Sequence, residues 1–257
     1  MTALPDETKI EDLSILGSHD TLALYGIGDF AGQCQSLPLD EQLKLGVRYL
    51  DLRLKESGNS LRACHGIVDE KQSFKETVSV LEKFLEAHPK EVLFASIKDE
   101  ANSNSPTFEE RLKDYVAEKN AWYVDSAMPA TLGQARGKIV LLSRYSSSTL
   151  GVPSFNGWAN SDTFQMGDFF IQDEYKVQSI AQKKQAITEC YAASATYKIN
   201  FLSGYLESGF PPSYAPSVAK EINPWFLSKL STFDLRGITV ADFVTTELAN
   251  AFYKEAA

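Results

Sequence analysis

The sequence predicts an α/β protein, a parallel (β/α) barrel in which strands and helices alternate along one chain. First, apolar strand-like runs are repeatedly followed by helix-like runs. Second, the chain has 257 residues, a length typical of one such barrel. Third, polar residues such as His19, Arg53 and Lys98 lie at or just beyond the ends of the apolar runs, and barrel active sites gather at that end of the strands. An open doubly wound sheet is the competing architecture.

The first half of the chain has clear element boundaries. Gly46 closes a brief helix, because glycine readily adopts the left-handed conformation that ends helices. Ser73 and Glu76 form a capping box that starts a longer helix, and Pro89 ends it. The expected strands are at 13–17, 47–54, 61–65 and 92–97, and the expected helices are at 38–45 and from 74 to Pro89.

The alternation continues through the second half. Thr107 with Glu110 predicts the start of another helix by the same capping pattern. The expected strands are at 138–142, 169–172, 198–202 and 237–240, and the expected helices are at about 178–194 and after Asp242. No internal repeat or obvious linker interrupts the pattern, so residues 1–257 are expected to form a single domain.

Composition excludes several classes of function. The chain has 25 Lys and Arg residues against 34 Asp and Glu residues, for a net charge of -9, which argues against nucleic-acid binding. No apolar run approaches the ~20 residues of a membrane span. Cys34, Cys64 and Cys190 are far apart in the sequence. We therefore expect free thiols or at most one disulfide, and no zinc motif.

Two of the three histidines fall in one constellation of short motifs. The motifs are Ser18-His19-Asp20, Asp51-Leu52-Arg53 and Cys64-His65-Gly66. Two imidazoles can act as a base and an acid, because the unperturbed pKa of histidine is ~6.5. A guanidinium is always charged and forks onto phosphate oxygens. These groups suit cleavage of a phosphodiester, and we expect no metal ion and no other cofactor. The competing interpretation is that both histidines are core residues and that Arg53 is a salt-bridged strand end.

Several stretches of the chain match a known family. The stretches are Leu16–Thr21, Gly46–Arg53, His65–Gly66, Ser96–Lys98, Arg136–Tyr145 and Gln172–Val177. They resemble the bacterial-type phosphatidylinositol-specific phospholipases C, whose catalytic barrel is the X domain. The resemblance implies an irregular (β/α)8 TIM-type barrel, with residues 1–257 as one catalytic domain. It also implies cleavage of phosphatidylinositol to diacylglycerol and inositol 1,2-cyclic phosphate.

The resemblance implies roles for the two histidines and their partners. His19 would take the proton of the inositol 2-hydroxyl, and Asp242 would hold the other ring nitrogen. His65 would protonate the departing glyceride oxygen, and Asp20 would support it. Nearby carboxylates should raise the pKa of an imidazole, because they favour its charged form. The competing interpretation of Asp242 is a helix N-cap.

The remaining roles concern the phosphate and the inositol ring. Arg53 would stabilise the charge that develops on the phosphate, and Asp51 would fix the local network. Strand alternation places these two side chains on one face, because they are two residues apart. The inositol pocket of the family carries over to Lys98, Arg144, Asp173 and Tyr175.

Two other classes of function compete with this one. A non-catalytic inositol-lipid binding module would keep the fold, but it needs no acid–base pair of histidines. A metal-dependent phosphodiesterase, like the calcium-using eukaryotic relatives, needs acidic ligands near the second strand end, where Arg53 stands here. Retention of both histidines and Arg53 therefore favours the metal-independent enzyme.

The resemblance further implies peripheral contact with phosphatidylinositol in membranes, and we expect a monomer. Exposed aromatic residues favour the bilayer boundary, so loops at 209–214 and 224–226 are candidate anchors, although Trp225 could equally be buried. The compartment stays open. The resemblance favours secretion, whereas residues 1–10 lack the basic and apolar segments of a signal peptide, which leaves the cytoplasm open.

Overall fold

A computed structural model describes residues 1–26, 32–101, 106–116, 121–146, 148–152, 158–207 and 214–256. Its centre is a curled sheet with the strand order β6-β7-β5-β2-β1-β13-β11-β9-β8. These strands are β1 (Ser14–Ser18), β2 (Tyr49–Ser57), β5 (Leu93–Asp99), β6 (Trp122–Tyr123), β7 (Ile139–Arg144), β8 (Thr163–Met166), β9 (Phe169–Gln172), β11 (Tyr197–Phe201) and β13 (Gly237–Ala241). Neighbouring strands from β6 to β9 are parallel, and β8 pairs with β9 in the antiparallel direction.

The sheet curls as a barrel does, but its path has two ends. Within the described ranges no ladder joins β6 to β8, so the barrel is open between them. An antiparallel hairpin of β3 (Ser60–His65) and β4 (Val68–Ser73) extends from β2. A separate pair is formed by β10 (Lys176–Val177) and β12 (Tyr205–Leu206). The prediction of an irregular barrel of the TIM type is confirmed.

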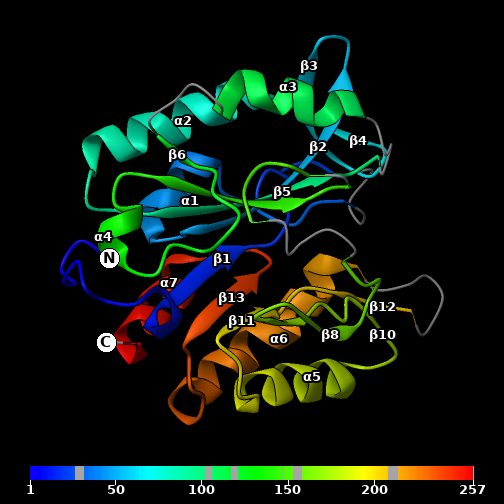
Figure 1. Ribbon diagram of the computed structural model, residues 1–257. Helices are drawn as coiled ribbons and strands as arrows, with labels where there is room; N and C mark the ends of the chain where they lie inside the picture. The colour runs from blue at the N-terminus through cyan, green and yellow to red at the C-terminus, as the bar shows by residue number, and fades with distance from the viewer. Residues whose placement is uncertain are drawn as a thin grey trace.

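Helices cover the outside of the curled sheet, with α2 and α3 along one side and α5 and α6 along the other (Figure 1). The helices are α1 (Leu39–Leu45), α2 (Phe74–Ala87), α3 (Pro106–Val116), α4 (Leu132–Ala135), α5 (Ile180–Ala192), α6 (Ala215–Lys229) and α7 (Thr246–Glu255). Short 3-10 turns lie at Ile10–Asp12 and Leu230–Thr232. None of the helices in the described part of the chain is long and apolar enough to cross a membrane.

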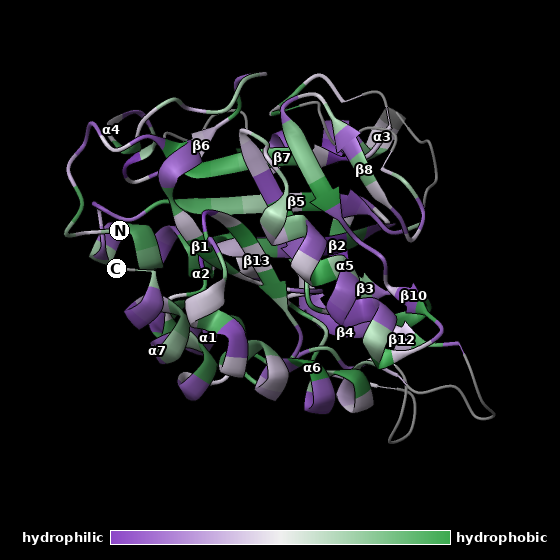
Figure 2. Cartoon of the chain, turned by 90° about the horizontal axis from the view of Figure 1, so that it is seen from below, coloured by the Kyte–Doolittle hydropathy of each residue, from purple (hydrophilic) through white to green (hydrophobic). Residues whose placement is uncertain are grey.

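Sequence signals explain the helix ends. Gly46 follows α1 with φ of 103°, the left-handed conformation that the sequence predicts for it. Ser73 and Glu76 form the expected capping box at the start of α2. The strands of the barrel are largely hydrophobic, whereas α1, α6 and α7 alternate hydrophobic and hydrophilic residues (Figure 2). All six residues of β7 are buried, as expected for a parallel strand covered on both faces.

Two expectations about local structure are wrong, and so is the competing interpretation of Asp242. The helix expected to be capped by Thr107 begins at Pro106 instead, so Thr107 lies inside α3. Residues 224–226 are not a loop, because Pro224 is an interior residue of α6. Proline lacks an N–H and usually ends a helix, yet α6 continues through this residue. Asp242 does not cap α7, whose N-cap is Thr245.

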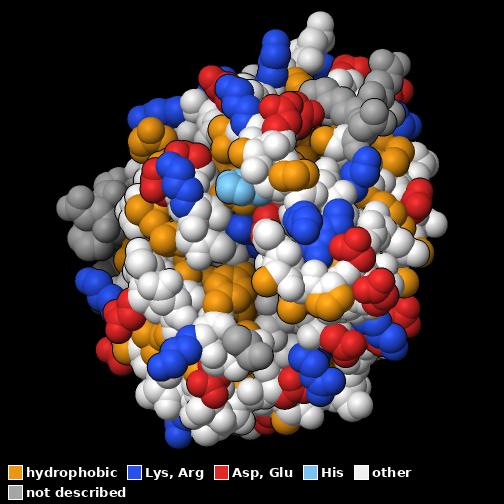
Figure 3. All heavy atoms as spheres, turned by 90° about the vertical axis from the view of Figure 1, so that its left-hand side faces the viewer, with side chains coloured by type: hydrophobic (Ala, Val, Ile, Leu, Met, Phe, Trp, Pro, Cys, Tyr) orange, Lys and Arg blue, Asp and Glu red, His pale blue; other side chains and the backbone are white. Residues whose placement is uncertain are grey.

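Strand register brings the predicted polar residues to one end of the barrel. Ser18 is paired with Ala241, so His19 and Asp242 follow neighbouring strands. Lys98 is paired with Arg53 on one side and with Arg144 on the other, so three cations lie side by side. Both chain termini lie on another face of the molecule, where acidic and basic side chains are interspersed (Figure 3).

Candidate active site

A cavity of about 940 Å³ opens at the carboxyl ends of the strands. Most of the predicted site residues line it. The lining includes His19, Arg53, His65, Lys98, Arg144, Asp173 and Tyr175. Asp20, Asp51 and Asp242 lie behind this lining and are almost completely buried. The structure therefore brings all ten predicted site residues to one place.

His19 is oriented by Asp242, which directly follows strand β13. Its Nδ1 atom lies 2.7 Å from Oδ1 of Asp242, so Nδ1 carries the proton and the carboxylate accepts it. The buried side chain of Gln35 fixes the backbone on both sides: Nε2 donates to the carbonyls of His19 over 2.8 Å and Ala241 over 2.9 Å. Its Oε1 accepts from the N–H of Val244 over 3.1 Å. The imidazole is thereby oriented with Nε2 toward the cavity.

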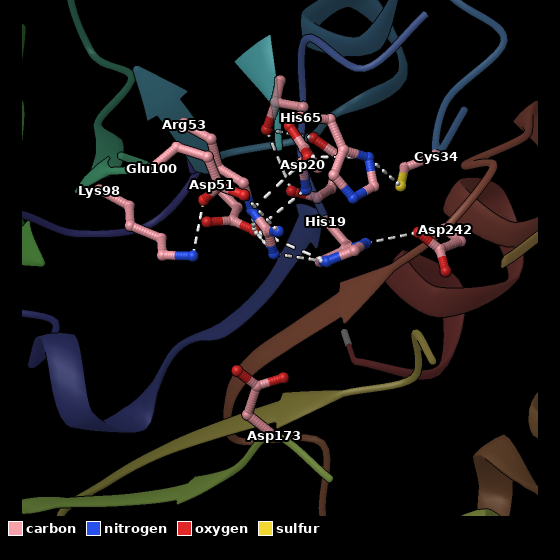
Figure 4. A network of polar contacts seen from close by, with 12 residues as sticks. His19, Asp20, Cys34, Asp51, Arg53, His65, Lys98, Glu100, Asp173 and Asp242 are labelled. Carbon is pink, nitrogen blue, oxygen red and sulfur yellow. Dashed lines mark hydrogen bonds and ion pairs between the residues drawn. The ribbon is translucent and has the colours of Figure 1, made fainter. Parts of the chain in front are cut away.

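Arg53 is the centre of the polar network (Figure 4). Its Nη2 atom donates to Nε2 of His19 over 2.7 Å, and to Oδ2 of Asp51 over 3.2 Å. Asp20 and Glu100 lie 3.6 Å and 3.8 Å from other nitrogens of the guanidinium. The prediction that Asp51 and Arg53 share a face of their strand is confirmed.

The carboxylates around Arg53 have different protonation behaviour. Burial would raise the pKa of Asp51, but Arg53 and Arg144 outweigh it and lower that pKa below its usual value. Burial raises the pKa of Asp20 well above its usual value, and Arg53 opposes this only in part. Asp51 is thus the ionised partner of Arg53, and it also accepts the backbone N–H of Asp20 over 3.0 Å.

His65 ends the hairpin strand β3 and lines the same cavity as His19. Its Nδ1 atom donates to the carbonyl of Gly32 over 2.6 Å, and Oδ2 of Asp20 is 3.4 Å away. Nδ1 is occupied by these contacts, which leaves Nε2 for a substrate. The expectation that carboxylates raise the histidine pKa is wrong here: burial and then Arg53 lower the pKa of His65. Burial was not visible in the sequence.

The four predicted inositol residues line the cavity, and each contacts another polar side chain. Lys98 Nζ contacts Oε2 of Glu100 over 2.6 Å. Arg144 Nη2 donates to Oδ2 of Asp173 over 3.2 Å. Tyr175 donates its hydroxyl hydrogen to Asn160 over 2.6 Å at the exposed rim. Each cation is therefore held by a carboxylate before any ligand arrives.

Sequence reasoning missed three residues of this site. Trp158 donates from Nε1 to Asp173 over 2.8 Å, and its ring lies under the guanidinium of Arg144 at 3.8 Å. Glu100 could have been found, because it lies two residues beyond Lys98 as Arg53 does beyond Asp51. Trp158 and Gln35 carry no such signal, because their roles depend on contacts distant in sequence.

Among the residues that the structure describes, two overlapping groups of side chains have the donor types that bind metal ions. Within each group, the ligand atoms lie within 4.8 Å of one another. The groups are His19, Cys34 and Asp242, and Asp20, Cys34 and His65. Cys34 belongs to both groups and lines the cavity. The sequence predicts either free thiols or at most one disulfide, and all three cysteines are free thiols.

The fold and the site together define an α/β-barrel enzyme with two imidazoles and a fixed guanidinium at the strand ends. Residues 9–145 match the family described as phosphatidylinositol-specific phospholipase C, X domain. The chain is 31% identical over 261 residues to a 1-phosphatidylinositol phosphodiesterase of Listeria monocytogenes, covering 95% of this chain and 80% of the relative. The chain therefore belongs to the phosphatidylinositol-specific phospholipase C X-domain family.

Further relatives agree with this assignment. A 1-phosphatidylinositol phosphodiesterase of Staphylococcus aureus is 28% identical over 258 residues, which cover 87% of this chain and 80% of that protein. The solved phosphatidylinositol-specific phospholipase C of Listeria monocytogenes superposes with a TM-score of 0.79 at 28% identity, covering 99% of this chain and 97% of that one. A mutant of the Staphylococcus aureus enzyme gives a TM-score of 0.81 at 24% identity, covering 96% of this chain and 94% of that one, a likeness of fold.

Proposed function

We propose that this chain is a metal-independent phosphatidylinositol-specific phospholipase C. It would cleave phosphatidylinositol to diacylglycerol and inositol 1,2-cyclic phosphate. The observation that carries the proposal is the placement of His19, Arg53 and His65 around one cavity, with the guanidinium in contact with the first imidazole. Family membership and the activity for which the relatives are named support the same substrate.

His19 is the proposed general base. The inositol 2-hydroxyl lies beside the phosphate, so its attack on phosphorus is effectively unimolecular. The hydroxyl would replace Arg53 at Nε2 of His19 and give up its proton there as the O–P bond forms. Asp242 would stabilise the imidazolium through Nδ1, the contact of 2.7 Å already present. Such acid–base work typically contributes ~10²–10⁴-fold to the rate.

His65 is the proposed general acid. It would deliver a proton from Nε2 to the glyceride oxygen as the P–O bond to diacylglycerol breaks. The carbonyl of Gly32 holds Nδ1–H and so fixes the ring. Asp20 lies beside the same nitrogen and would support the charged form whenever it is ionised.

Arg53 would supply the positive charge that the phosphate needs. In the transition state, charge grows on the non-bridging oxygens, and a preorganised cation stabilises it. Asp51 anchors the guanidinium by accepting from both Nε and Nη2. Lys98, Arg144 and Asp173 would bind ring hydroxyls, and Tyr175 would stack on the ring at the rim. With this cation built in, the reaction needs no divalent metal.

Contact with the membrane would occur at the mouth of the cavity, and residues 1–257 would act as one monomeric unit. The structure alters the expected anchors: Trp225 lies in α6, where its ring packs against Phe233, and residues 208–213 lie outside the described part. Ile67, between β3 and β4, lines the cavity and is 88% exposed. Tyr25 is also exposed, and Lys71 lies over its ring at 4.1 Å. An apolar tip with a nearby cation suits an anionic lipid surface.

Product analysis on phosphatidylinositol vesicles tests this function. Phosphorus NMR should show a five-membered cyclic phosphate, and lipid extraction should give diacylglycerol, at equal rates with and without excess chelator. The matched control is His65→Ala, which keeps the cavity but lacks the acid. Binding to the vesicles without turnover by the unmodified chain would instead identify a lipid-binding module. Activity that chelator abolishes and calcium restores would place the chain in the metal-dependent class.

A further inference from the structure

Cys34 lies close to both proposed catalytic imidazoles (Figure 4). Its Sγ atom is 3.8 Å from Nδ1 of His65. The same sulfur also forms a group with His19 and Asp242. It is completely buried by the protein yet forms part of the cavity wall. A soft ligand is thus available beside the acid–base pair, and the mechanism above does not use it.

Two buried carboxylate oxygens point to a cation at this place. Oδ2 of Asp20 and Oδ2 of Asp242 are both buried and accept no hydrogen bond in the described structure, although Oδ2 of Asp20 lies in ion-pair range of Arg53 Nε at 3.6 Å and of His65 Nδ1. A buried oxygen without a hydrogen bond is costly, and a bound cation would satisfy it. Oδ2 of Asp20 lies 3.4 Å from Nδ1 of His65. Asp20, His65 and Cys34 form one of the two groups of possible ligands described above.

The distances fit a thiophilic ion. A tetrahedral zinc ion with its usual bond lengths holds sulfur and nitrogen about 3.6 Å apart, and nitrogen and carboxylate oxygen about 3.4 Å apart. The corresponding separations here are 3.8 Å between Cys34 and His65 and 3.4 Å between His65 and Asp20. Sγ of Cys34 and a carboxylate oxygen of Asp20 lie within 4.8 Å of each other, and His65 must turn Nδ1 from the carbonyl of Gly32 toward the ion to complete the site.

The local charge also permits a cation. Five carboxylates, Asp20, Asp51, Glu100, Asp173 and Asp242, share the site with three cations, Arg53, Lys98 and Arg144. A metal ion would take Asp20 from Arg53, and Arg53 would keep Asp51 and Glu100. The three ligands are far apart in the sequence, so they form no recognisable metal-binding motif.

We propose that Cys34, His65 and Asp20 form an inhibitory site for a thiophilic divalent ion, Zn²⁺ or Cd²⁺. On binding, the thiol and any protonated Asp20 carboxyl release their protons to solvent, and the metal takes the sulfur, a carboxylate oxygen of Asp20 and the Nδ1 lone pair of His65. The proton of His65 moves to Nε2, and the Nδ1–H bond to Gly32 is lost. A metal-bound imidazole no longer acts as the general acid, so turnover stops. The inhibition, though not the binding, rests on the proposed function.

Metal binding is tested first, without reference to activity. Calorimetry with Cd²⁺ should show one site per chain, and the ultraviolet thiolate-to-cadmium charge-transfer band should appear with the same stoichiometry. Cys34→Ser and Cys34→Ala should both lose the band. Two substitutions are used so that the test still stands if one of the variants fails to fold. Cys190→Ser is the control, because Cys190 is also buried but contacts the carbonyl of Ile199. A band that persists without Cys34, or binding without a band, overturns the site.

Inhibition by Zn²⁺ is tested second. The turnover rate of each variant is divided by the rate of the same variant in excess chelator. The Zn²⁺ concentration for half inhibition should rise more than about tenfold in the two Cys34 variants, since loss of even an outer partner costs metal affinity ~10–100-fold. It should not change in Cys190→Ser. Equal inhibition of all variants overturns the proposal. If the unmodified chain has no activity at all, the proposed function fails while the binding experiment still decides the metal site.

Discussion

Arg53 donates a hydrogen bond from Nη2 to Nε2 of His19 over 2.7 Å. The bond requires the neutral imidazole with its proton on Nδ1, the atom that faces Asp242 at 2.7 Å. The proposed base therefore lies in its reactive tautomer, with its lone pair occupied by the proposed phosphate clamp. A substrate must separate the two groups, placing a hydroxyl on His19 and a phosphate oxygen on Arg53.

Replacement of Arg53 by lysine should lower kcat by about 10²–10³-fold, the usual effect of losing a preorganised charge stabiliser. An ammonium keeps the charge but loses the planar fork that contacts Asp51 and His19 together. The measurement is turnover of phosphatidylinositol vesicles in excess chelator. Arg111→Lys is the matched control, because Arg111 lies on α3 and contacts Glu56 of β2, away from the residues that line the cavity. Near-full activity of Arg53→Lys would remove the clamp from the mechanism.

His19→Ala and His65→Ala should each lower kcat by at least ~10²–10⁴-fold. The double variant should lose scarcely more than either single variant, because the base and the acid act as a unit. Circular dichroism should show that both singles keep the fold. Losses that simply multiply in the double variant would show that the two imidazoles act independently.

The pH dependence follows from the lowered pKa of His65. Burial and Arg53 hold this pKa below the ordinary 6.5, and the acid works only when protonated. The high-pH limb of kcat/KM, which reports the free enzyme, should therefore fall below the ordinary histidine value. A bound phosphate anion favours the imidazolium, so the limb of kcat should lie at higher pH. Both limbs can be measured from the pH dependence of kcat and kcat/KM on a soluble phosphodiester. Their apparent pKa values belong to the coupled pair of His19 and His65. A limb of kcat/KM above the ordinary value would contradict the structure.

The sequence predicts the strand ends well and the contacts between them poorly. Apolar runs place His19, Arg53 and Lys98 at the carboxyl ends of strands, and strand register then brings these residues together without further information. The hydrogen bond from His65 to Gly32 and the role of Trp158 depend on segments that only the folded chain brings close. Proline usually ends a helix, but α6 continues through Pro224 because burial of one face of the helix stabilises it.

Ile67→Ser tests the proposed membrane contact. Transfer of an exposed isoleucine side chain into lipid is worth roughly 1.5–3 kcal/mol, so vesicle affinity should fall about 10–100-fold. Turnover of a soluble phosphodiester should not change, because Ile67 lies at the rim and not at the phosphate. Leu4→Ser is the control, since Leu4 is also exposed (43%) but lies near the N-terminus, where its carbonyl contacts Arg136. Equal effects on vesicles and on the soluble substrate would argue against an anchor.

Glu91 stabilises the end of the barrel opposite the cavity. Its carboxylate accepts from Arg48 over 2.7 Å and from Thr2, and it pairs with the N-terminal ammonium at 3.4 Å. Burial would raise its pKa, but these partners outweigh burial and lower the pKa to about 2.

A pKa lowered by folding contributes stability that is complete above the unfolded value and is lost as the pH falls through the folded value. Glu91→Gln should therefore cost roughly 2–3 kcal/mol at neutral pH, and urea unfolding should show the gap to the unmodified chain closing as the pH falls from about 5 toward 2. Glu11→Gln, which breaks an exposed pair with Lys9, should change little. A gap for Glu91→Gln that stays constant with pH would mean that the loss comes from packing, because only an ionised carboxylate in the folded chain makes the gap depend on pH.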